Sequence, residues 1–319
     1  MNTSFYYWKT SYQLNQNELQ ALNLFHSKKL YIRMMDVDLD ENGALPVPIS
    51  PVVFKEKLPD TLALVPVVFV VNRALQNLSK PQLDKLSAQI LYFVNGKVKQ
   101  AGKNSFDELQ IDCDWTASTR DNYFYLLHQI KALLQPKHQQ LSVTLRLHQL
   151  KNQKSSGIPP ANRVLLMCYN MGNLRKYGRQ NSILELAELK KYLNENLKNY
   201  PLPADVALPL FSWAVAFRNK QYIGISKRLT ETTLQNQANF TRLNPDFYVV
   251  KTALPNYGLQ PGDEIRWENI PPEKLQEVSR YLSGYLKPEP LNLIFFHLDA
   301  PLFKKYSDEE LEKTADLLR

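Results

Sequence analysis

The chain is poor in cysteine and glycine and has no long apolar segment. Only two cysteines occur in 319 residues, Cys113 and Cys168, and both lie in apolar stretches. We therefore expect buried free thiols instead of a disulfide or a Cys/His metal site. The longest apolar run, residues 62–71, is far shorter than the ~20 residues that span a bilayer. The sequence thus predicts no membrane-spanning segment.

Several motifs of known chemistry are also missing. With 10 glycines, the chain has no Gly-rich turn between a strand and a helix that would hold a nucleotide. It contains neither a Gly-x-Ser-x-Gly nor a His-Glu-x-x-His sequence, which argues against serine hydrolases and zinc proteases. The acidic segment 36–43 has its glycine too late for a calcium loop. We therefore expect neither a metal nor a cofactor.

The charge is positive but diffuse. The formal net charge is +8, and acidic residues are interleaved with Lys and Arg along most of the chain. A dispersed excess of this kind is typical of a solvated surface, so we expect no nucleic-acid partner. The hydrophobic fraction of 44%, with 17 Tyr and 14 Phe, is enough for a packed core and argues against disorder.

Apolar strand patterns alternate with amphipathic helix patterns along the whole chain. The predicted strands are 5–10, 29–37, 62–71, 108–116, 141–147, 163–170, 205–215 and 291–298. The predicted helices are 15–25, 79–94, 118–134, 183–197, 271–286 and 308–318. No helix of normal length follows the fifth strand, and the acidic, Pro-rich segment 36–51 predicts an irregular loop.

This alternation predicts one (β/α)8 TIM barrel of class α/β over residues 1–319. Two probable hairpins, at 215–226 and 247–267, predict an elaboration after strand seven, at about 215–267. A doubly wound open sheet is the main alternative, but the chain lacks the glycine-rich turn that such sheets use for nucleotides.

The fourth strand carries two carboxylates on one face. Asp112 and Asp114 alternate with Ile111 and Cys113, so a strand places the acids on one side and the apolar residues on the other. Because desolvating a carboxylate is costly, such a strand needs a charged partner or a polar surface. Asp112 paired with Arg146 on the next strand would be a purely structural answer.

Barrel active sites lie where strands meet the following loops, and these positions are polar and aromatic here. Carboxylates together with Trp, Tyr and His favour a carbohydrate site, because aromatic rings pack on sugar faces and carboxylates bind hydroxyls. Packing or ion pairing is the alternative role for each of these side chains. The candidate substrate-binding residues are Trp8, Arg33, Asp36, Arg146, His148, Tyr169, Asn170, Trp213 and His297.

The segment from Ile111 to Trp115 resembles the fourth-strand signature of chitinase-like glycoside hydrolases of family eighteen, Asp-x-Asp-x-Glu. The wider pattern is still more similar to an uncharacterised bacterial barrel family, a domain of unknown function. The resemblance implies a glycoside hydrolase-like barrel that acts on a glycan at the carboxyl rim of the strands. The position of that family's general acid is Thr116 here, and Thr does not protonate a leaving group at ordinary pH.

Two functional hypotheses follow. In the first, the protein is a glycosidase with candidate catalytic residues Asp112, Asp114 and Asp299; Asp114 is the acid, its pKa raised by Asp112, and Asp112, Asp36 or Asp299 assists. In the second, the barrel has lost the acid and only binds a glycan or a protein. The sequence leaves open whether the chain is an enzyme.

The expected partner is an oligo- or polysaccharide, and the oligomeric state is not predicted. The sequence does not begin with a charged stretch and an apolar segment of a signal peptide. From the glycan hypothesis alone we expect a protein exported to the periplasm or cell envelope, with its signal outside this sequence. A cytoplasmic location is the alternative.

Overall fold

Eight parallel strands form a closed barrel in the part of the chain that the computed structural model describes, residues 2–226, 228–287, 290–303 and 305–318. In chain order they are β1 (Asn2–Tyr7), β3 (Lys29–Leu39), β6 (Ala63–Val70), β7 (Glu108–Asp112), β8 (Gln140–Arg146), β9 (Arg163–Met167), β10 (Ala204–Pro209) and β16 (Asn292–Phe296). Strand β1 pairs with both β3 and β16, which closes the sheet. The predicted TIM barrel is confirmed.

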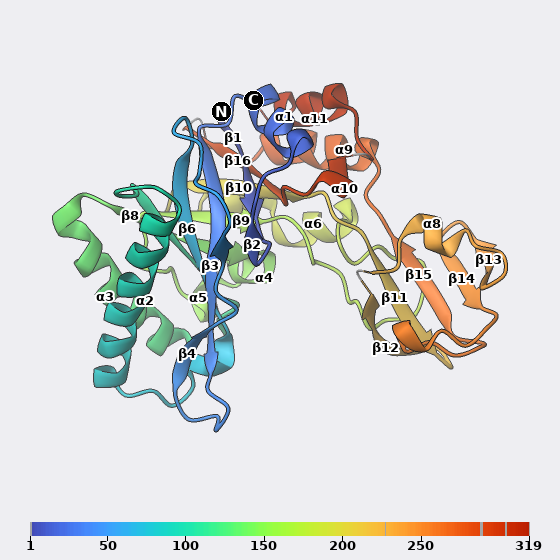
Figure 1. Cartoon of the computed structure of the whole chain (residues 1–319), viewed down its shortest axis with the longest axis horizontal. Coiled ribbons are helices and arrows are strands. Elements are labelled where there is room, and N and C mark those ends of the chain that lie inside the picture. Colours follow the sequence, from blue (N-terminus) through green and yellow to red (C-terminus); the bar gives the residue numbers. More distant parts are fainter. Residues whose placement is uncertain (1, 227, 288–289, 304, 319) are drawn as a thin grey trace.

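Helices outside the barrel connect most of these strands (Figure 1). They include α1 (Gln16–Leu24), α2 (Lys80–Gln100), α3 (Arg120–Leu134), α6 (Leu186–Tyr192), α7 (Asn194–Lys198), α9 (Pro272–Ser283) and α11 (Asp308–Asp316). The start of α11 is fixed by a capping box, in which the Ser307 hydroxyl accepts from the Glu310 N–H and the Glu310 carboxylate accepts from the Ser307 N–H.

One helix prediction needs correction. The predicted helix 183–197 begins later and is divided into α6 and α7 at Leu193. After β8, where no helix of normal length is expected, the chain forms two short ones, α4 (Leu147–Lys151) and α5 (Gln153–Ser156). Such pieces are too short for apolar periodicity to reveal.

The segment after β3 is more regular than the sequence predicts. Strand β4 (Pro46–Ile49) pairs antiparallel with the end of β3, so the expectation of an irregular loop over 36–51 is wrong for this part. Proline cannot donate a backbone hydrogen bond, and Pro46 and Pro48 fit here because β4 is the edge strand of its sheet. The short strands β2 (Ser11–Tyr12) and β5 (Val53–Phe54) pair nearby.

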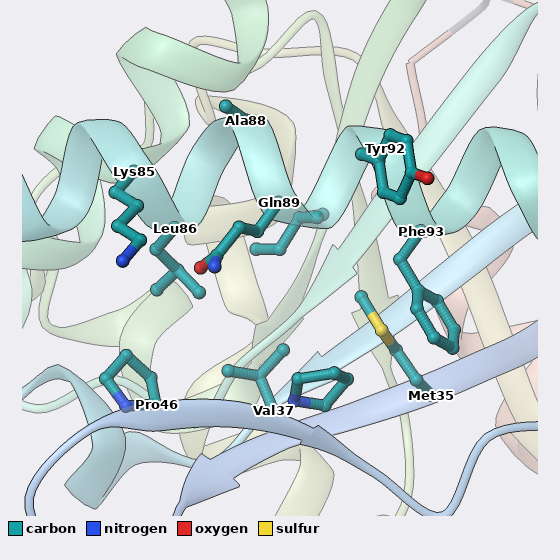
Figure 2. A pocket seen from close by; sticks show the side chains of 11 residues that line it. Met35, Val37, Pro46, Lys85, Leu86, Ala88, Gln89, Tyr92 and Phe93 are labelled. Carbon is teal, nitrogen blue, oxygen red and sulfur yellow. The ribbon is translucent and has the colours of Figure 1, made fainter.

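An apolar groove of about 430 Å³ lies between this β3–β4 hairpin and α2. Figure 2 shows Leu86 and Phe93 of α2 opposite Val37 and Met35 of β3. Side chains alternate along a strand, so Asp36, between these two β3 residues, points to the opposite face, into the barrel. The groove and the barrel mouth therefore lie on the two sides of one strand.

Residues 213–268 form a second, antiparallel sheet, five-stranded within the described residues and set to one side of the barrel (Figure 1). Its strands are β11 (Trp213–Arg218), β12 (Gln221–Ser226), β13 (Phe240–Asn244), β14 (Phe247–Val250) and β15 (Glu264–Glu268), with the short helix α8 (Glu231–Leu234) on one face. Strands β11 and β12 form the first predicted hairpin, and β14 pairs with β15. We call this unit the insertion sheet.

The predicted seventh strand, 205–215, spans two different strands. Barrel strand β10 ends at Pro209, and the chain leaves the barrel before β11 starts at Trp213. Both strands are buried and only three residues, two of them apolar, lie between them, so the boundary is hard to find in the sequence. Val215 and Phe217 of β11 pack in the same apolar core as the barrel, which joins the two units.

Candidate functional site

The interior of the barrel is polar along the β7–β8 side. The Tyr6 hydroxyl donates to Gln110, whose side-chain amide donates to Ser142 Oγ at 3.3 Å. Ser142 Oγ in turn donates to Glu108 Oε1 at 2.7 Å. These buried groups satisfy one another, as buried polar groups must. Beyond this row of hydrogen-bonded side chains, toward the carboxyl ends of the strands, lie the two carboxylates Asp112 and Asp114.

The register between β7 and β8 decides the partners of these carboxylates. Ile111 pairs with Val143, so each β7 residue lies beside the β8 residue 32 positions later. Asp112, the last residue of β7, therefore meets Thr144, and Asp114, beyond the end of the strand, contacts Arg146. The predicted structural pair of Asp112 with Arg146 is wrong, because it needs a register shifted by two residues.

Asp112 is the carboxyl group with the unusual environment. Burial raises its pKa to about 6, and the nearby charge of Asp114 acts in the same direction. A hydrogen bond from Thr144 Oγ1 at 2.6 Å and the charge of Arg146 oppose this rise. The sequence expectation gave the raised pKa to Asp114, whereas the structure gives it to Asp112, which lies deeper in the barrel.

Asp114 is held by Arg146 in a two-point ion pair. Arg146 Nε donates to one carboxylate oxygen, and Nη2 donates to the other at 2.8 Å. The Asp114 side chain remains 43% exposed. Both oxygens therefore accept hydrogen bonds from one guanidinium. His148 lies close by on α4, where partial burial and the Arg146 charge lower its pKa.

Thr116, the residue that the resemblance sets at the place of the acid in chitinase-like enzymes, belongs to a small hydroxyl and amide cluster. Its Oγ1 lies 2.9 Å from Ser118 Oγ and accepts from Asn72 Nδ2 at 3.4 Å. The Thr119 hydroxyl donates to Asn72 Oδ1. Asn72 starts the short 3-10 helix η1 (Asn72–Leu75) that follows β6. This cluster contains hydrogen-bonding groups but no acid.

Aromatic rings form the other side of the barrel mouth, around Phe296 at the end of β16. The Phe296 ring centroid lies 5.5 Å from those of Tyr6 and Trp8 and 5.4 Å from that of Tyr169. Burial raises the pKa of the Tyr169 hydroxyl, and the charge of Asp112 adds to this, which places Tyr169 beside the carboxylates. The structure thus brings the candidates Trp8 and Tyr169 together around Phe296, with Asp112 near enough to Tyr169 to affect its pKa.

Sequence reasoning missed Phe296, because a Phe in an apolar strand is indistinguishable from an ordinary core residue. The strand predicted at 291–298 ends earlier, at Phe296, so the candidates His297 and Asp299 both lie beyond β16. Asp299 pairs with Lys9 at 2.8 Å, and Lys9 also binds the buried Glu18.

Strand β16 lies four strands from β7 in either direction around the barrel, so Asp299 follows the strand opposite the Asp112 carboxylate. On β3, Arg33 pairs with Asp36 and donates from Nη2 to the Ser50 carbonyl at 3.1 Å. The Asp36 charge contributes to the raised pKa of Asp112. These two candidates therefore belong to the same electrostatic neighbourhood.

The remaining candidates lie toward the insertion sheet. Asn170 follows β9 with φ +54° and is exposed. Trp213 is only 7% exposed and donates from Nε1 to Glu268 at 2.9 Å. Its ring contacts Phe211, which in turn contacts Tyr169. Trp213 therefore supports the aromatic side of the mouth from behind.

Among the described residues, no group of three or more His, Cys, Asp or Glu side chains is arranged to hold a metal ion. Over the same part of the chain, no helix has the length and apolarity needed to cross a bilayer.

Chitinases are among the solved structures that are similar to this chain. A chitinase from Chromobacterium violaceum is 12% identical over 99% of this chain and 98% of its own, with a TM-score of 0.57. The fold is that of chitinase-like barrels. The Group IV chitinase of Ostrinia furnacalis is 10% identical, covers 99% of both chains and has a TM-score of 0.57.

The spore cortex-lytic enzyme SleL of Bacillus megaterium is 14% identical over 100% of this chain and 74% of its own, with a TM-score of 0.56. At such identities the likeness concerns the fold, and the predicted resemblance is confirmed at that level. Comparisons with protein-family models and with curated proteins gave no match.

Proposed function

We propose that this protein binds a glycan at the carboxyl end of its barrel without cleaving it. The arrangement of Asp114 and Thr116 carries this proposal. Both oxygens of Asp114 accept hydrogen bonds from Arg146, and Thr116 supplies a hydroxyl where the resembling family has its acid. Glycoside hydrolysis needs a group that protonates the leaving oxygen.

The same mouth has the features of a sugar site. Rings of Trp8 and Tyr169 lie beside Phe296, and Asp112, Asp114 and the Asn72–Thr119 cluster provide donors and acceptors. Pyranose rings pack on aromatic faces, while their hydroxyls need such polar partners. One of the similar structures, the second catalytic domain of an Ostrinia furnacalis Group II chitinase, contains penta-N-acetylchitooctaose, which makes N-acetylglucosamine oligomers the first probe.

A second candidate function is hydrolysis with Asp112 as the proton donor. Its pKa of about 6 keeps a fraction of this carboxyl protonated near neutral pH, which is what a general acid requires. The two candidates differ in turnover and not in binding.

The test measures both quantities on the same samples. Calorimetric titration with N-acetylglucosamine pentamer and with cell-wall polysaccharide fragments measures binding, and chromatography after long incubation measures cleavage. We expect binding without products, and binding weakened at least tenfold in Tyr169→Ala. Products that disappear in Asp112→Asn would establish the hydrolase instead, and the absence of binding to every glycan would overturn the proposal.

A further inference from the structure

The segment between β9 and α6, residues 168–185, has no regular structure yet carries two candidate residues, Tyr169 and Asn170. Its two ends are joined: Asn170 N donates to the Ile183 carbonyl at 2.8 Å, and Gly172 N donates to the Ser182 carbonyl at 3.2 Å. A Cβ on Gly172 would lie 2.9 Å from the Cα of Ser182, so this approach requires glycine. We call residues 168–185 the β9 loop.

One arginine of the insertion sheet holds the middle of this loop. Arg266 of β15 is 1% exposed, and its Nη1 donates to the carbonyls of Lys176 and Gly178 at 2.7 and 3.0 Å. Nη2 donates to the Leu174 carbonyl at 3.1 Å. A guanidinium is the only side chain whose rigid fork can bind three carbonyls in this way.

One carboxylate of the same strand holds the end of the loop. Glu268 is 2% exposed and accepts from Arg266 Nε at 2.7 Å. Its other oxygen accepts from the Ser182 N–H and hydroxyl, at 2.8 and 2.6 Å, and from Trp213 Nε1 at 2.9 Å. Every oxygen of this buried charge is therefore occupied, which is the condition under which a buried pair fixes one conformation.

We infer that Arg266 and Glu268 are positioning residues for glycan binding. They hold the β9 loop and Trp213 in the bound arrangement before the ligand arrives. Ser182 lies directly against the backbone of Gly172, which is two residues from Asn170. The Trp213 ring contacts Phe211, and Phe211 contacts Tyr169. A preordered loop costs less conformational entropy on binding. This inference rests on the proposed function.

The first variant is Arg266→Lys, which keeps the charge but loses the fork. Arg179→Lys is the matched control: Arg179 lies in the same loop and pairs with Asp246 at the surface. Hydrogen–deuterium exchange without ligand should be at least tenfold faster at Asn170, Gly172 and Ser182 in Arg266→Lys. It should be unchanged in the control and in the strands of the barrel.

Calorimetric titration with the N-acetylglucosamine pentamer then tests the positioning role. We expect Arg266→Lys to bind at least tenfold more weakly, with the loss in the binding entropy, because the loop must now be ordered by the ligand. A merely structural pair would leave the affinity of the folded variant unchanged. Gly172→Ala, which pushes Ser182 away and spreads the base of the loop while leaving the Arg266 and Glu268 side chains unchanged, should show the same entropic loss.

The outcomes separate the two proposals. If the wild type binds the pentamer and a loosened loop binds it equally well, the positioning role is overturned while the proposed function stands. Unchanged loop exchange in Arg266→Lys also overturns the positioning role. If the wild type binds no glycan, the proposed function fails and the positioning role fails with it. Should Arg266→Lys not fold, Glu268→Gln, which keeps the shape of the side chain, replaces it in both measurements.

Discussion

Glu268 in the insertion sheet is a buried carboxyl group and Asp112 in the barrel is a partly buried one, and their surroundings differ. Glu268 accepts hydrogen bonds from Arg266, Ser182 and Trp213, which occupy both of its oxygens. Asp112 accepts from Thr144 and has the like charge of Asp114 beside it. Glu268, whose two oxygens both have donors, stabilises one conformation. Asp112 has fewer donors and can still accept a hydrogen bond from a ligand hydroxyl.

The largest expected effect on stability comes from removing the Glu268 carboxylate. Glu268→Ala leaves Arg266 as a buried charge without its carboxylate and leaves the Trp213 and Ser182 donors unpaired. Breaking a buried ion pair from one side costs about 3–5 kcal/mol. Urea unfolding at pH 7 measures the loss, and a value below about 1 kcal/mol would show that water replaces the carboxylate.

Removing the charge of Asp112 should change the free energy of unfolding by an amount that depends on pH. The pKa of Asp112 is raised from 3.8 to about 6, so the folded protein retains this proton while the unfolded chain releases it. The contribution of Asp112 to stability is therefore present below pH 4, falls between pH 4 and pH 6, and is lost above that. The size of this change is on the order of 3 kcal/mol.

Asp112→Asn keeps an acceptor for Thr144 but does not titrate, so it should lack this fall. The difference in unfolding free energy between variant and wild type should shift in favour of Asn as the pH rises from 4 to 7. Urea unfolding across this range provides the measurement. A pH-independent difference would mean that Asp112 titrates like an exposed carboxyl group.

A smaller change should sharpen the description of Asp112. Thr144→Val has nearly the same shape but loses the hydroxyl that donates to the carboxylate. That hydrogen bond lowers the pKa of Asp112, so its loss should move the pKa upward by roughly one unit, equivalent to about 1.4 kcal/mol. Carbon-13 NMR of the carboxyl groups follows the titration directly. A downward shift would contradict this assignment of the hydrogen bond.

The smallest effect is expected at the surface of the insertion sheet. Asp246→Ala removes the ion pair with Arg179. The Asp246 side chain is 38% exposed and that of Arg179 is 65% exposed. Exposed pairs contribute about 0–1 kcal/mol. Urea unfolding of this variant beside Glu268→Ala compares an exposed and a buried pair within the same unit, and equal losses would contradict the distinction.

The barrel could be predicted because its strands have a recognisable sequence pattern. Buried on both faces, they appear as apolar runs such as Ala63–Val70, and helices with apolar stripes separate them. Strand β4 was missed because its prolines normally exclude a strand and are tolerated only at an edge. Whether a strand lies at an edge is a tertiary property.

The candidate site was predictable in position but not in its pairings. Strand ends pointed to Asp112, Asp114, Arg146 and Tyr169, which do lie close together. Which acid meets Arg146 depends on the β7–β8 register, and two strands joined through a helix carry no local signal of that register. The contacts of Arg266 and Glu268 with the β9 loop could not be predicted for a similar reason. Arg266 binds the Lys176 carbonyl, which lies ninety residues earlier in the chain.

The pairing of β1 with β16 has a consequence for biosynthesis. Asn2 lies beside Asn292, so one edge of β1 is uncovered until β16, 290 residues later in the chain, has been made. Until then the aromatic segment from Phe5 to Tyr7 can pair with β3 on one side only. An uncovered strand edge is a template for association with other chains. We therefore expect the edge of β1 that faces β16 to stay open to association with other chains until β16 has been made.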